Sequence, residues 1–419
     1  MMKKTDVLVI GAGINGLSAA WFLNEAGFNV TVADKGDGLN NCSFGNAGMI
    51  VPSHIIPLAA PGVISQGLKW MLKPESPFSI RPRLNREFLS WVWKFKQAST
   101  QKHVEQSAPV LKDLLLKNRE LLVELEEAEQ LDFDFQKNGL FMLCNTQKGF
   151  EEEAEVAEAI REQELPAEIL TSEEVRQQFP KVKLKIKGGV YYPLDAHMHP
   201  NTLMVQLRNA LIQKGVTFRN QTEVTHIDPS KEDEVRVKTS SGEVLIASKV
   251  IVCAGVWSAE LGKTISVNIP MQAGKGYSLT LENPPFKTQH CAIFSEARAT
   301  MTPMGGKLRF AGTMEIVGNK EQINPAKITG LKKSITHFLP DITERHFQGC
   351  DPWVGLRPVS PDGLPYIGNI KSHKNIYVST GHAMMGMSLG LVSGKIIADL
   401  IQKGKSDHEH PLIAPDRYN

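Results

Sequence analysis

The sequence predicts an α/β protein, in which a Rossmann-type dinucleotide-binding domain carries an inserted α+β domain built on an antiparallel sheet. Three observations predict this fold. A glycine-rich turn joins a buried strand to a helix within the first 25 residues. A similar strand ending in Ala-Gly appears more than 200 residues later, as if an insertion interrupted the first sheet. Other segments alternate between apolar and polar residues, which is typical of antiparallel strands.

The composition is that of a globular protein. At ~150 residues per domain, 419 residues allow two or three domains. With 42% hydrophobic and 22% charged residues, the chain is too apolar to be disordered, and its net charge of +2 does not favour nucleic acid as a partner. The five cysteines are scattered, which excludes a disulfide framework or a zinc knuckle and suits a reducing compartment.

No apolar run approaches the ~18–20 residues that a membrane-spanning helix needs. The stretch MMKKTDVLVI runs directly into glycines without a cleavage site, so it is predicted to be a strand and not a signal peptide. We expect a cytoplasmic protein, with peripheral attachment to the cytoplasmic face of the inner membrane as the alternative.

The first forty residues form a predicted βαβ unit. Val7–Ile10 is a buried strand, Gly11–Gly16 reads G-x-G-x-x-G, and a helical pattern extends from Leu17 to Glu25. A second strand, Asn29–Ala33, leads to Asp34. In such a unit the first glycine makes the turn, the second admits a pyrophosphate, the third allows close helix packing, and the acid binds a ribose hydroxyl. The unit therefore predicts a bound dinucleotide.

Only one dinucleotide is predicted. No second G-x-G-x-x-G opens a helix after a strand, whereas a flavoenzyme reduced by NAD(P)H usually needs two such units. The segment Lys249–Ser258 contains a buried strand ending in Ala254-Gly255, which we expect to rejoin the nucleotide-binding sheet.

Beyond this unit, the sequence resembles the D-amino-acid oxidase-like flavoproteins, and within them the D-amino-acid dehydrogenases, nearly from end to end. The resemblance implies a two-domain FAD enzyme that oxidises the Cα–N bond of an amino or imino acid. It implies an FAD-binding domain of residues 1–80, 195–265 and 350–419, and a substrate domain of residues 81–194 and 266–349. Seven segments carry it in order: Ser43–Gly48, Pro57–Gly62, Leu68–Met71, Lys275–Thr280, Leu308–Thr313, Trp353–Gly363 and Thr380–Ser388.

The resemblance also implies which residues contact FAD. Gly45 stands where some relatives carry a histidine covalently joined to flavin, so noncovalent FAD is expected, with a thioether to Cys42 or Cys350 as the alternative. The expected contacts are Gly11, Gly13, Ile14, Asn15, Gly16, Asp34, Lys35, Ser43, Asn46, Ala47, Gly48, Met49, Val224, Ala254, Gly255, Trp257, Gly355, Arg357, Gly381, Met384, Met385, Gly386 and Met387.

The glycine-rich turn Gly381–Gly390, followed by a helix from about Ser388 to Lys403, has the form of an anion stabiliser. Reduced flavin accumulates negative charge around N1 and C2=O, which a helix N-terminus would stabilise. We expect Met385, Gly386 and Met387 near the flavin ring; the alternative is a packing turn. His382 is predicted either to touch flavin or substrate or to be structural.

Substrate recognition is expected from Arg357, because an arginine between apolar residues and a proline is costly to bury without an anion. The anion would be the substrate carboxylate or the flavin edge, or else a structural partner. Glycine oxidases of the superfamily place a carboxylate-binding arginine where this chain has Met304, so Arg298 or Arg357 would take that role. Tyr277 is a further candidate, with a packed core tyrosine as the alternative.

Three histidines lie near expected loops. His54 follows a flavin-contacting loop and is expected either to line the pocket or to be structural. His197 and His199 lack further ligands nearby, so we expect a solvent-facing strand end and no metal site.

Four strands of the substrate sheet are expected within 133–143, 189–192, 275–281 and 300–313, and an amphipathic helix at 103–130. Glu151–Glu155 is predicted to be a solvated helix face. Residues 62–96 hold half of the tryptophans and seven Lys or Arg against two Glu, a pattern that suits an anionic membrane surface. The alternative is core aromatic residues among solvated charges.

The function predicted is oxidative deamination of a free D-amino acid, D-proline and hydroxy-D-proline included, by hydride transfer from Cα to flavin N5. A respiratory quinone would accept the electrons. Met304 and His54 favour a cyclic or apolar substrate. The alternatives are an oxygen-using oxidase of secondary or N-methyl amino acids and a non-catalytic flavin-binding protein; the oligomeric state is left open.

Overall fold

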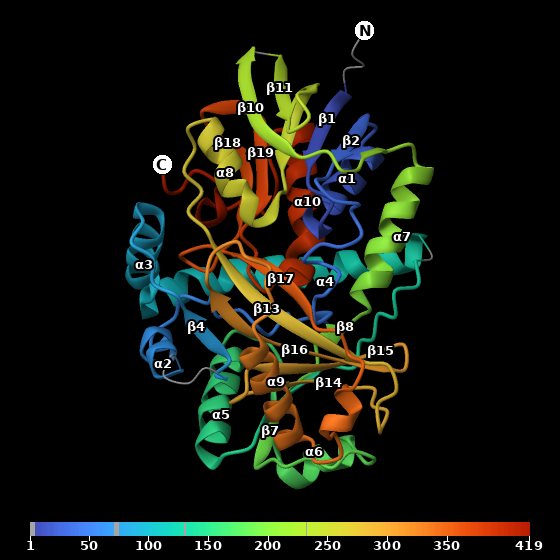
Figure 1. The fold of residues 1–419 in the computed structure, drawn as a ribbon, viewed down its shortest axis with the longest axis vertical. Helices are drawn as coiled ribbons and strands as arrows, with labels where there is room; N and C mark the ends of the chain where they lie inside the picture. Colours follow the sequence, from blue (N-terminus) through green and yellow to red (C-terminus); the bar gives the residue numbers. More distant parts are fainter. Residues whose placement is uncertain (1–4, 71–74, 130, 232) are drawn as a thin grey trace.

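The structure, a computed structural model, describes residues 5–70, 75–129, 131–231 and 233–419. Residues 1–4 of the predicted N-terminal strand segment, Met71 of the Leu68–Met71 motif and the last residue of the predicted helix 103–130 lie outside them. Two lobes, each built on a sheet, lie one above the other along the long axis (Figure 1). Both chain termini lie at the upper lobe, which contains the N-terminal strand.

The upper sheet has eight strands and grows around the predicted βαβ unit. Strand β1 is apolar along most of its length because parallel neighbours, β2 and β12, flank it on both sides. Strand β12 confirms that the second buried strand rejoins this sheet, and it also pairs in parallel with β19. The sheet consists of β1 (Thr5–Ile10), β2 (Val30–Ala33), β9 (Thr217–Arg219), β10 (Val224–Lys231), β11 (Glu234–Thr239), β12 (Val244–Val252), β18 (Tyr366–Ile370) and β19 (His373–Thr380).

Two helices, α1 (Ile14–Glu25) and α10 (Gly386–Lys403), pack side by side against this sheet. Glycine makes the close approach possible, since a Cβ on Gly394 would lie 2.4 Å from the carbonyl carbon of Ser18. Helix α10 begins two residues earlier than predicted and ends at the predicted Lys403, followed by Gly404 in the left-handed conformation. The N-termini of both helices thereby point toward the lower lobe (Figure 1).

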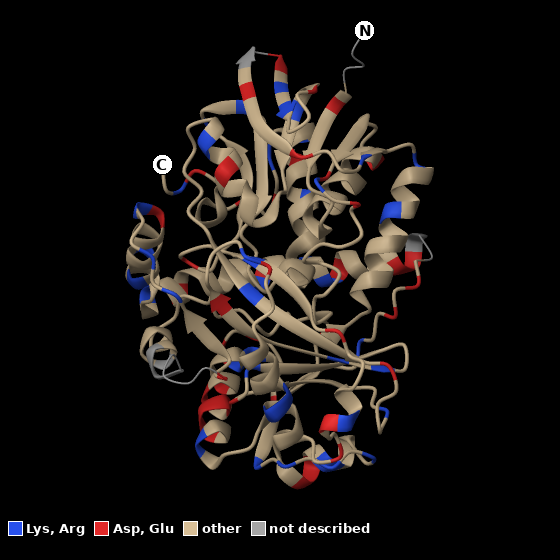
Figure 2. Ribbon diagram, in the orientation of Figure 1, with Lys and Arg blue, Asp and Glu red and all other residues tan. Residues whose placement is uncertain are grey.

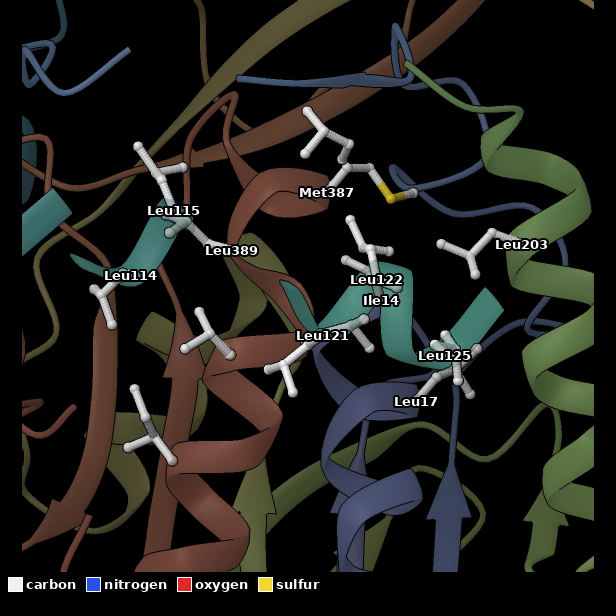
Figure 3. Packing of buried hydrophobic residues seen from close by; sticks show 14 of the residues in the cluster. Ile14, Leu17, Leu114, Leu115, Leu121, Leu122, Leu125, Leu203, Met387 and Leu389 are labelled. Atoms are coloured by element: carbon white, nitrogen blue, oxygen red, sulfur yellow. The ribbon is translucent and has the colours of Figure 1, made fainter. Parts of the chain in front are cut away.

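The long helix α4 (Gln101–Glu129) crosses below α1 and α10 and confirms the predicted amphipathic helix. Its buried Leu121, Leu122 and Leu125 face Ile14 and Leu17 of α1 in one apolar cluster (Figure 3). This packing fixes the level at which the two helix N-termini meet the lower lobe.

The lower sheet has nine strands and is mixed, not purely antiparallel as predicted. Strand β5 runs parallel to β14, and β4 runs parallel to β16, because long connections between them allow either direction. The predicted boundaries at 80 and 350 differ from the sheet boundaries, since β4 and β17 hydrogen-bond within the lower sheet. The sheet consists of β4 (Phe78–Ile80), β5 (Leu140–Cys144), β6 (Glu168–Thr171), β7 (Gly188–Tyr192), β13 (Gln272–Leu281), β14 (Cys291–Phe294), β15 (Ala299–Met304), β16 (Lys307–Ile316) and β17 (Trp353–Val359).

The remaining elements cover these sheets or connect them. Helix α5 carries the predicted acidic face, although Glu153 on it is buried. None of the helices in the described ranges combines the length and apolarity needed to cross a bilayer. These elements are α2 (Val63–Trp70), α3 (Arg86–Ala98), α5 (Gln147–Glu162), α6 (Ser172–Gln178), α7 (Pro200–Gln213), α8 (Ser258–Thr264), α9 (Pro325–Phe338), the 3-10 turns η1 (Gly255–Trp257), η2 (Glu344–Phe347) and η3 (Pro411–Ile413), and the short pair β3 (Met49–Ile50) and β8 (Ala196–His197).

Candidate active site between the two lobes

A single cavity of about 1150 Å³ extends from the glycine-rich turn before α1 to the lower sheet. Its walls include every residue predicted to contact FAD except Gly16, Gly48 and Gly381. These three glycines shape the walls, because an added Cβ would meet Gly11 O at 1.9 Å, Met198 O at 2.3 Å and the Tyr366 ring at 2.6 Å, respectively. The last two also have a positive φ.

The upper end of the cavity fits a dinucleotide. An added Cβ at Gly13 would meet only Ser43 Oγ, at 3.6 Å, so this side of the turn faces open space. The first-turn N–H groups of α1 lie beside this space, where a helix N-terminus favours a pyrophosphate. Asn15 contributes a buried Oδ1 without a partner among the described residues. The backbone N–H donors of α1 and the Asn15 acceptor together fit FAD.

Asp34 and Lys35 complete this end. The Asp34 carboxylate accepts hydrogen bonds from Ala12 N at 2.7 Å and Gly36 N at 2.8 Å, which hold it at the end of β2. Lys35 Nζ stands 3.1 Å from the centre of the Trp257 ring. Together with Val224 and Ala254, these residues line the part of the cavity where the ribose and adenine of FAD would lie.

The glycine-rich turn before α10 lies against the middle of the cavity. Met384, Met385, Gly386 and Met387 line it, and an added Cβ at Gly386 would meet only Ile14, at 3.9 Å. Open space therefore faces the N-terminus of α10, where backbone N–H groups would stabilise an anionic flavin edge.

His382 is positioned by hydrogen bonds within the protein and does not present a free nitrogen to a ligand. Ser393 Oγ donates to Leu389 O at 2.6 Å and accepts from His382 Nε2 at 2.8 Å. His382 Nδ1 then accepts from Asn15 Nδ2 at 2.9 Å. Burial lowers the pKa of His382 to about 3, so the ring is neutral and serves to orient the Asn15 side chain.

The structure leaves no room for a larger side chain at residue 45. An added Cβ at Gly45 would lie 1.9 Å from the Trp353 ring, so no larger residue fits there while Trp353 keeps its place. Cys42 Sγ bonds the backbone of Leu356, and burial raises the pKa of its thiol. Cys350 lies outside the cavity walls and bonds Thr280 O.

Arg357 of β17 is one of the cations that line the cavity. Within the described residues it makes one hydrogen bond, from Nη1 to Thr313 O at 2.7 Å, and no ion pair. Its guanidinium packs on Gly276, where a Cβ would lie 2.0 Å from Nη1. Burial lowers the pKa of Arg357 to about 10, so the side chain remains charged at neutral pH and a negative ligand would stabilise it.

Two other residues considered for substrate binding lie differently from expectation. The Tyr277 hydroxyl donates to Glu315 Oε1 at 2.6 Å and accepts from Asn324 N at 3.0 Å, so only its ring forms part of the wall. Met304 is fully buried near Gly48 and does not line the cavity. Position 304 therefore cannot present a carboxylate-binding group to the cavity. Arg298 and Arg357 supply the guanidinium groups in its walls.

The far end of the cavity is lined in part by α5 and combines apolar walls with polar side chains. Leu111, Met142, Val156, Ile160 and Ile293 form the apolar part. His54, Tyr192, Ser295, Arg298 and Glu153 provide the polar part.

Arg298 lies in the β14–β15 turn with a positive φ of 48°. Burial raises the pKa of Glu153, which accepts a hydrogen bond from Ser295 Oγ at 3.1 Å. The predicted residues His54 and Arg298 are thus brought to the end of the cavity opposite the dinucleotide turn.

The histidine pair does not lie at a solvent-facing strand end as predicted. His197 is 1% exposed in β8, where it pairs with Met49 of β3, and His199 caps α7. Burial lowers the pKa of both. Among the described residues, no group of three or more His, Cys, Asp or Glu is arranged to hold a metal ion.

Sequence reasoning missed Ser53, Tyr192, Asp195 and Glu153, which line or support the far end of the cavity. Glu153 was hidden in an acidic run whose other members are solvated or half-buried. Asp195 begins the segment Asp195–Pro200, whose histidines drew attention to metal binding instead. The only available signal was an acid between buried strands, which has many structural uses.

Comparisons with known proteins agree with this arrangement. The sequence profile of the family described as DAO, FAD dependent oxidoreductase, matches residues 6–400. A D-amino acid dehydrogenase of Helicobacter pylori is 29% identical over 413 residues, which are 98% of this chain and 98% of that protein.

Solved structures show the same fold. Glycine oxidase from Geobacillus kaustophilus has a TM-score of 0.79 at 20% identity and covers 99% of this chain and 99% of its own. L-proline dehydrogenase from P. horikoshii has a TM-score of 0.74 at 18% identity, covering 100% of this chain and 98% of its own. At these identities, the likeness concerns the fold alone.

Proposed function

This chain belongs to the DAO family of FAD-dependent oxidoreductases, and from that membership we propose that it is a dehydrogenase of free D-amino acids. The observation that carries the proposal is Arg357, a half-buried guanidinium without an ion-pair partner in the described structure, beside the glycine-rich turn before α10. A free amino acid has the carboxylate that such a group binds. The D-amino acid dehydrogenase similar over its full length supports the same substrate class.

In the proposed reaction, different residues of the chain bind the substrate and stabilise charge on the cofactor. FAD, when bound, would supply the two-electron chemistry as the acceptor of the hydride that leaves the substrate Cα. Arg357 would hold the carboxylate, and the apolar far end would take the side chain and exclude water. The N-terminus of α10 would stabilise negative charge at the flavin edge through backbone N–H groups.

An anaerobic screen tests this function. The yellow holoenzyme is mixed with D- and L-amino acids, including D-proline and hydroxy-D-proline, and flavin absorbance is followed. Bleaching by a D-amino acid and not by its L-enantiomer supports the proposal. No bleaching by any amino acid would instead indicate a non-catalytic flavin-binding protein.

D-proline and hydroxy-D-proline are included in the screen because His54 lines the far end of the cavity. Met304, the other residue taken to favour a cyclic substrate, does not line the cavity. The electron acceptor is tested in the same preparation. Rapid peroxide formation in air without a dye or quinone would favour an oxidase of secondary or N-methyl amino acids, whereas turnover that needs a quinone supports a dehydrogenase.

The exposed residues of α3 support the proposal that the electron acceptor is a quinone in a membrane. Leu89 is 52% and Trp93 60% exposed, whereas Phe88 and Trp91 of the same helix are buried, so the aromatic residues of 62–96 divide between core and surface. Basic residues also occur along α3 (Figure 2), and exposed apolar residues together with basic residues suit an anionic bilayer. Residues 71–74 of the segment lie outside the described structure.

Vesicle sedimentation tests the membrane contact. The enzyme should sediment with vesicles of anionic phospholipid at low salt and less with zwitterionic ones, because basic side chains are attracted to the negative surface. Leu89→Ser with Trp93→Ser should reduce sedimentation. Equal sedimentation of wild type and variant would remove α3 from the contact.

A further inference from the structure

Three side chains at the far end of the cavity are joined in a line. Ser53 Oγ lies 3.0 Å from His54 Nδ1 and 2.6 Å from Asp195 Oδ2. Ser53 N donates to the other oxygen, Asp195 Oδ1, at 3.0 Å, so two bonds fix the carboxylate on Ser53. Asp195 is fully buried, whereas the His54 side chain is 33% exposed and lines the cavity.

The order of these bonds assigns the protons. Asp195 as a carboxylate only accepts, so the Ser53 hydroxyl donates to it. Ser53 Oγ therefore accepts from His54 Nδ1–H, and Nε2 of the neutral ring carries the lone pair. Within the described residues Nε2 has no hydrogen-bond partner, and it is not among the buried unpartnered atoms. It is therefore the ring nitrogen available to a ligand in the cavity.

The proposed reaction creates a need for such a group. A free amino acid carries an ammonium group at neutral pH, and its nitrogen must lose a proton before the lone pair can assist hydride loss from Cα. Among the other polar residues at the far end, Arg298 only donates, and the Glu153 carboxyl is already hydrogen-bonded to Ser295 and Tyr192.

We propose that His54, Ser53 and Asp195 form a proton relay that deprotonates the substrate ammonium. This inference rests on the proposed amino-acid substrate. The N–H bond of the ammonium breaks as Nε2–H forms on His54. The Nδ1 proton passes to Ser53 Oγ, and the Ser53 hydroxyl proton passes to Asp195 Oδ2. The substrate becomes a neutral amine and Asp195 a neutral acid, so one positive and one negative charge disappear together.

The surroundings suit this end point. Burial raises the pKa of Asp195 to about 7, against the lowering effects of its bonds to Ser53 and of the Arg119 charge. Burial and the positive charge of Arg298 lower the pKa of His54 to about 4. A proton is therefore more stable on the Asp195 carboxyl than on the His54 ring. The imidazole passes the proton on and does not remain protonated.

Other titratable groups face Asp195 without supplying charge at neutral pH. Tyr191 and Tyr192 of β7 and Cys291 of β14 all have a pKa raised by burial, so each is neutral. Arg119 on α4 and His54 complete the set of ionisable neighbours. The carboxyl of Asp195 is consequently the only one of these groups expected to change charge near neutral pH.

The test measures the anaerobic rate of flavin reduction as a function of pH in His54→Gln, Ser53→Ala and Asp195→Asn. Each variant should lose about 10²-fold at pH 7, the lower range for a general base. Since the variants depend on amine that is already neutral in solution, their rates should rise about tenfold per pH unit and come within about threefold of wild type near pH 10. The wild-type rate should fall below about pH 7 as Asp195 takes up a proton.

Asp113→Asn is the matched control, because exposed Asp113 contacts His408 on the far side of α4 and lies outside the cavity walls. It should reproduce the wild-type profile. Variants that lose the same factor at every pH would show a structural role and overturn the relay, as would variants that follow the wild type. A wild type that no amino acid reduces would instead contradict the proposed function.

A second measurement needs no turnover. Histidine ¹⁵N NMR should show His54 as a neutral ring protonated at Nδ1, like His290, whose Nδ1 donates to Asn138 O at 3.2 Å. The His54 signal should be absent in His54→Gln and should shift toward the Nε2–H form in Ser53→Ala. A His54 ring protonated at Nε2 in the wild type would contradict the proton order and therefore the relay.

Discussion

At the scale of single residues, Asp34 and Arg357 differ in how far the protein itself satisfies their hydrogen-bonding groups. Asp34 is held by two backbone N–H groups and Arg357 by one carbonyl, so the first is satisfied and the second retains donors for a ligand. The difference matters because a buried guanidinium without an anion is costly. The cavity is thus best complemented by a ligand that brings its own carboxylate.

Replacing Arg357 tests this directly. Arg357→Ala should lower kcat/KM about 30- to 1000-fold, mainly through KM, because removing one member of a charged pair that the bound ligand shields from water costs about 2–4 kcal/mol. Arg357→Lys should recover part of the loss, since it keeps the charge without the two-pronged geometry. Anaerobic reduction over a range of substrate concentrations measures both parameters, and unchanged kinetics would remove Arg357 from the substrate site.

The glycines of the first turn give a matched pair. Gly13→Val should yield folded, colourless protein, because the protein leaves room for the added Cβ whereas a bound pyrophosphate would collide with the side chain. Gly16→Ala should instead destabilise the fold, since its Cβ would stand 1.9 Å from Gly11 O. Circular dichroism and flavin content separate the two outcomes; a yellow Gly13→Val protein would contradict the assigned cofactor turn.

At the scale of elements, the C-terminal tail holds the loop that follows β17. Arg417 donates to both oxygens of Asp362, from Nε at 2.7 Å and Nη2 at 2.9 Å, and Tyr418 OH adds a third bond. The same loop lines the cavity through Gly363 and Pro365. The tail therefore stabilises a wall of the cofactor site from outside.

Asp362→Asn should cost about 3–5 kcal/mol of unfolding free energy at pH 7, because it leaves Arg417 buried without its anion. Burial alone would raise the pKa of Asp362, but the ion pair with Arg417 lowers it overall. The carboxylate therefore contributes stability above the unfolded pKa of about 4, which is lost as pH falls through the lower folded value. Urea unfolding should show the difference between variant and wild type shrinking in acid; a constant difference would contradict the ion pair's role.

At the scale of the whole molecule, the cavity joins the two lobes. Residues from β1 and β2 line one end, and residues from β13, β16 and β17 line the other. A dinucleotide lying along the cavity would contact both sheets. It would therefore bind only the folded chain, in which both lobes are in place. Cofactor binding and the stability of both lobes should consequently be coupled.

Removing FAD should lower the stability of both lobes together. Restoring free FAD to about 100 times its dissociation constant should raise the unfolding free energy by about 2.7 kcal/mol by mass action. The apoprotein is heated at increasing FAD concentrations, and limited proteolysis reports the unfolding of each lobe through its fragments. The shift for each lobe measures the coupling between FAD binding and its stability. Protection confined to the upper lobe would contradict a ligand that spans the cavity.

The sequence alone determined the parts that depend on local sterics. The strand, glycine turn, helix and acid of residues 7–34 lie close together in the chain, so backbone rules fixed their geometry and predicted the dinucleotide site. The glycine-rich turn and helix at the C-terminal end were predictable for the same reason. The far strand β12 was also identified, because a strand buried on both faces is apolar throughout.

Tertiary structure decided the far end of the cavity and the lobe boundaries. Ser53 and Asp195 meet across 142 positions of sequence, and β4 and β17 join the lower sheet through hydrogen bonds with strands far away in the chain. Met304 and Arg298 are six positions apart, yet only Arg298 lines the cavity. Such contacts depend on how complete sheets and helices pack, and residue type or spacing does not encode that packing locally.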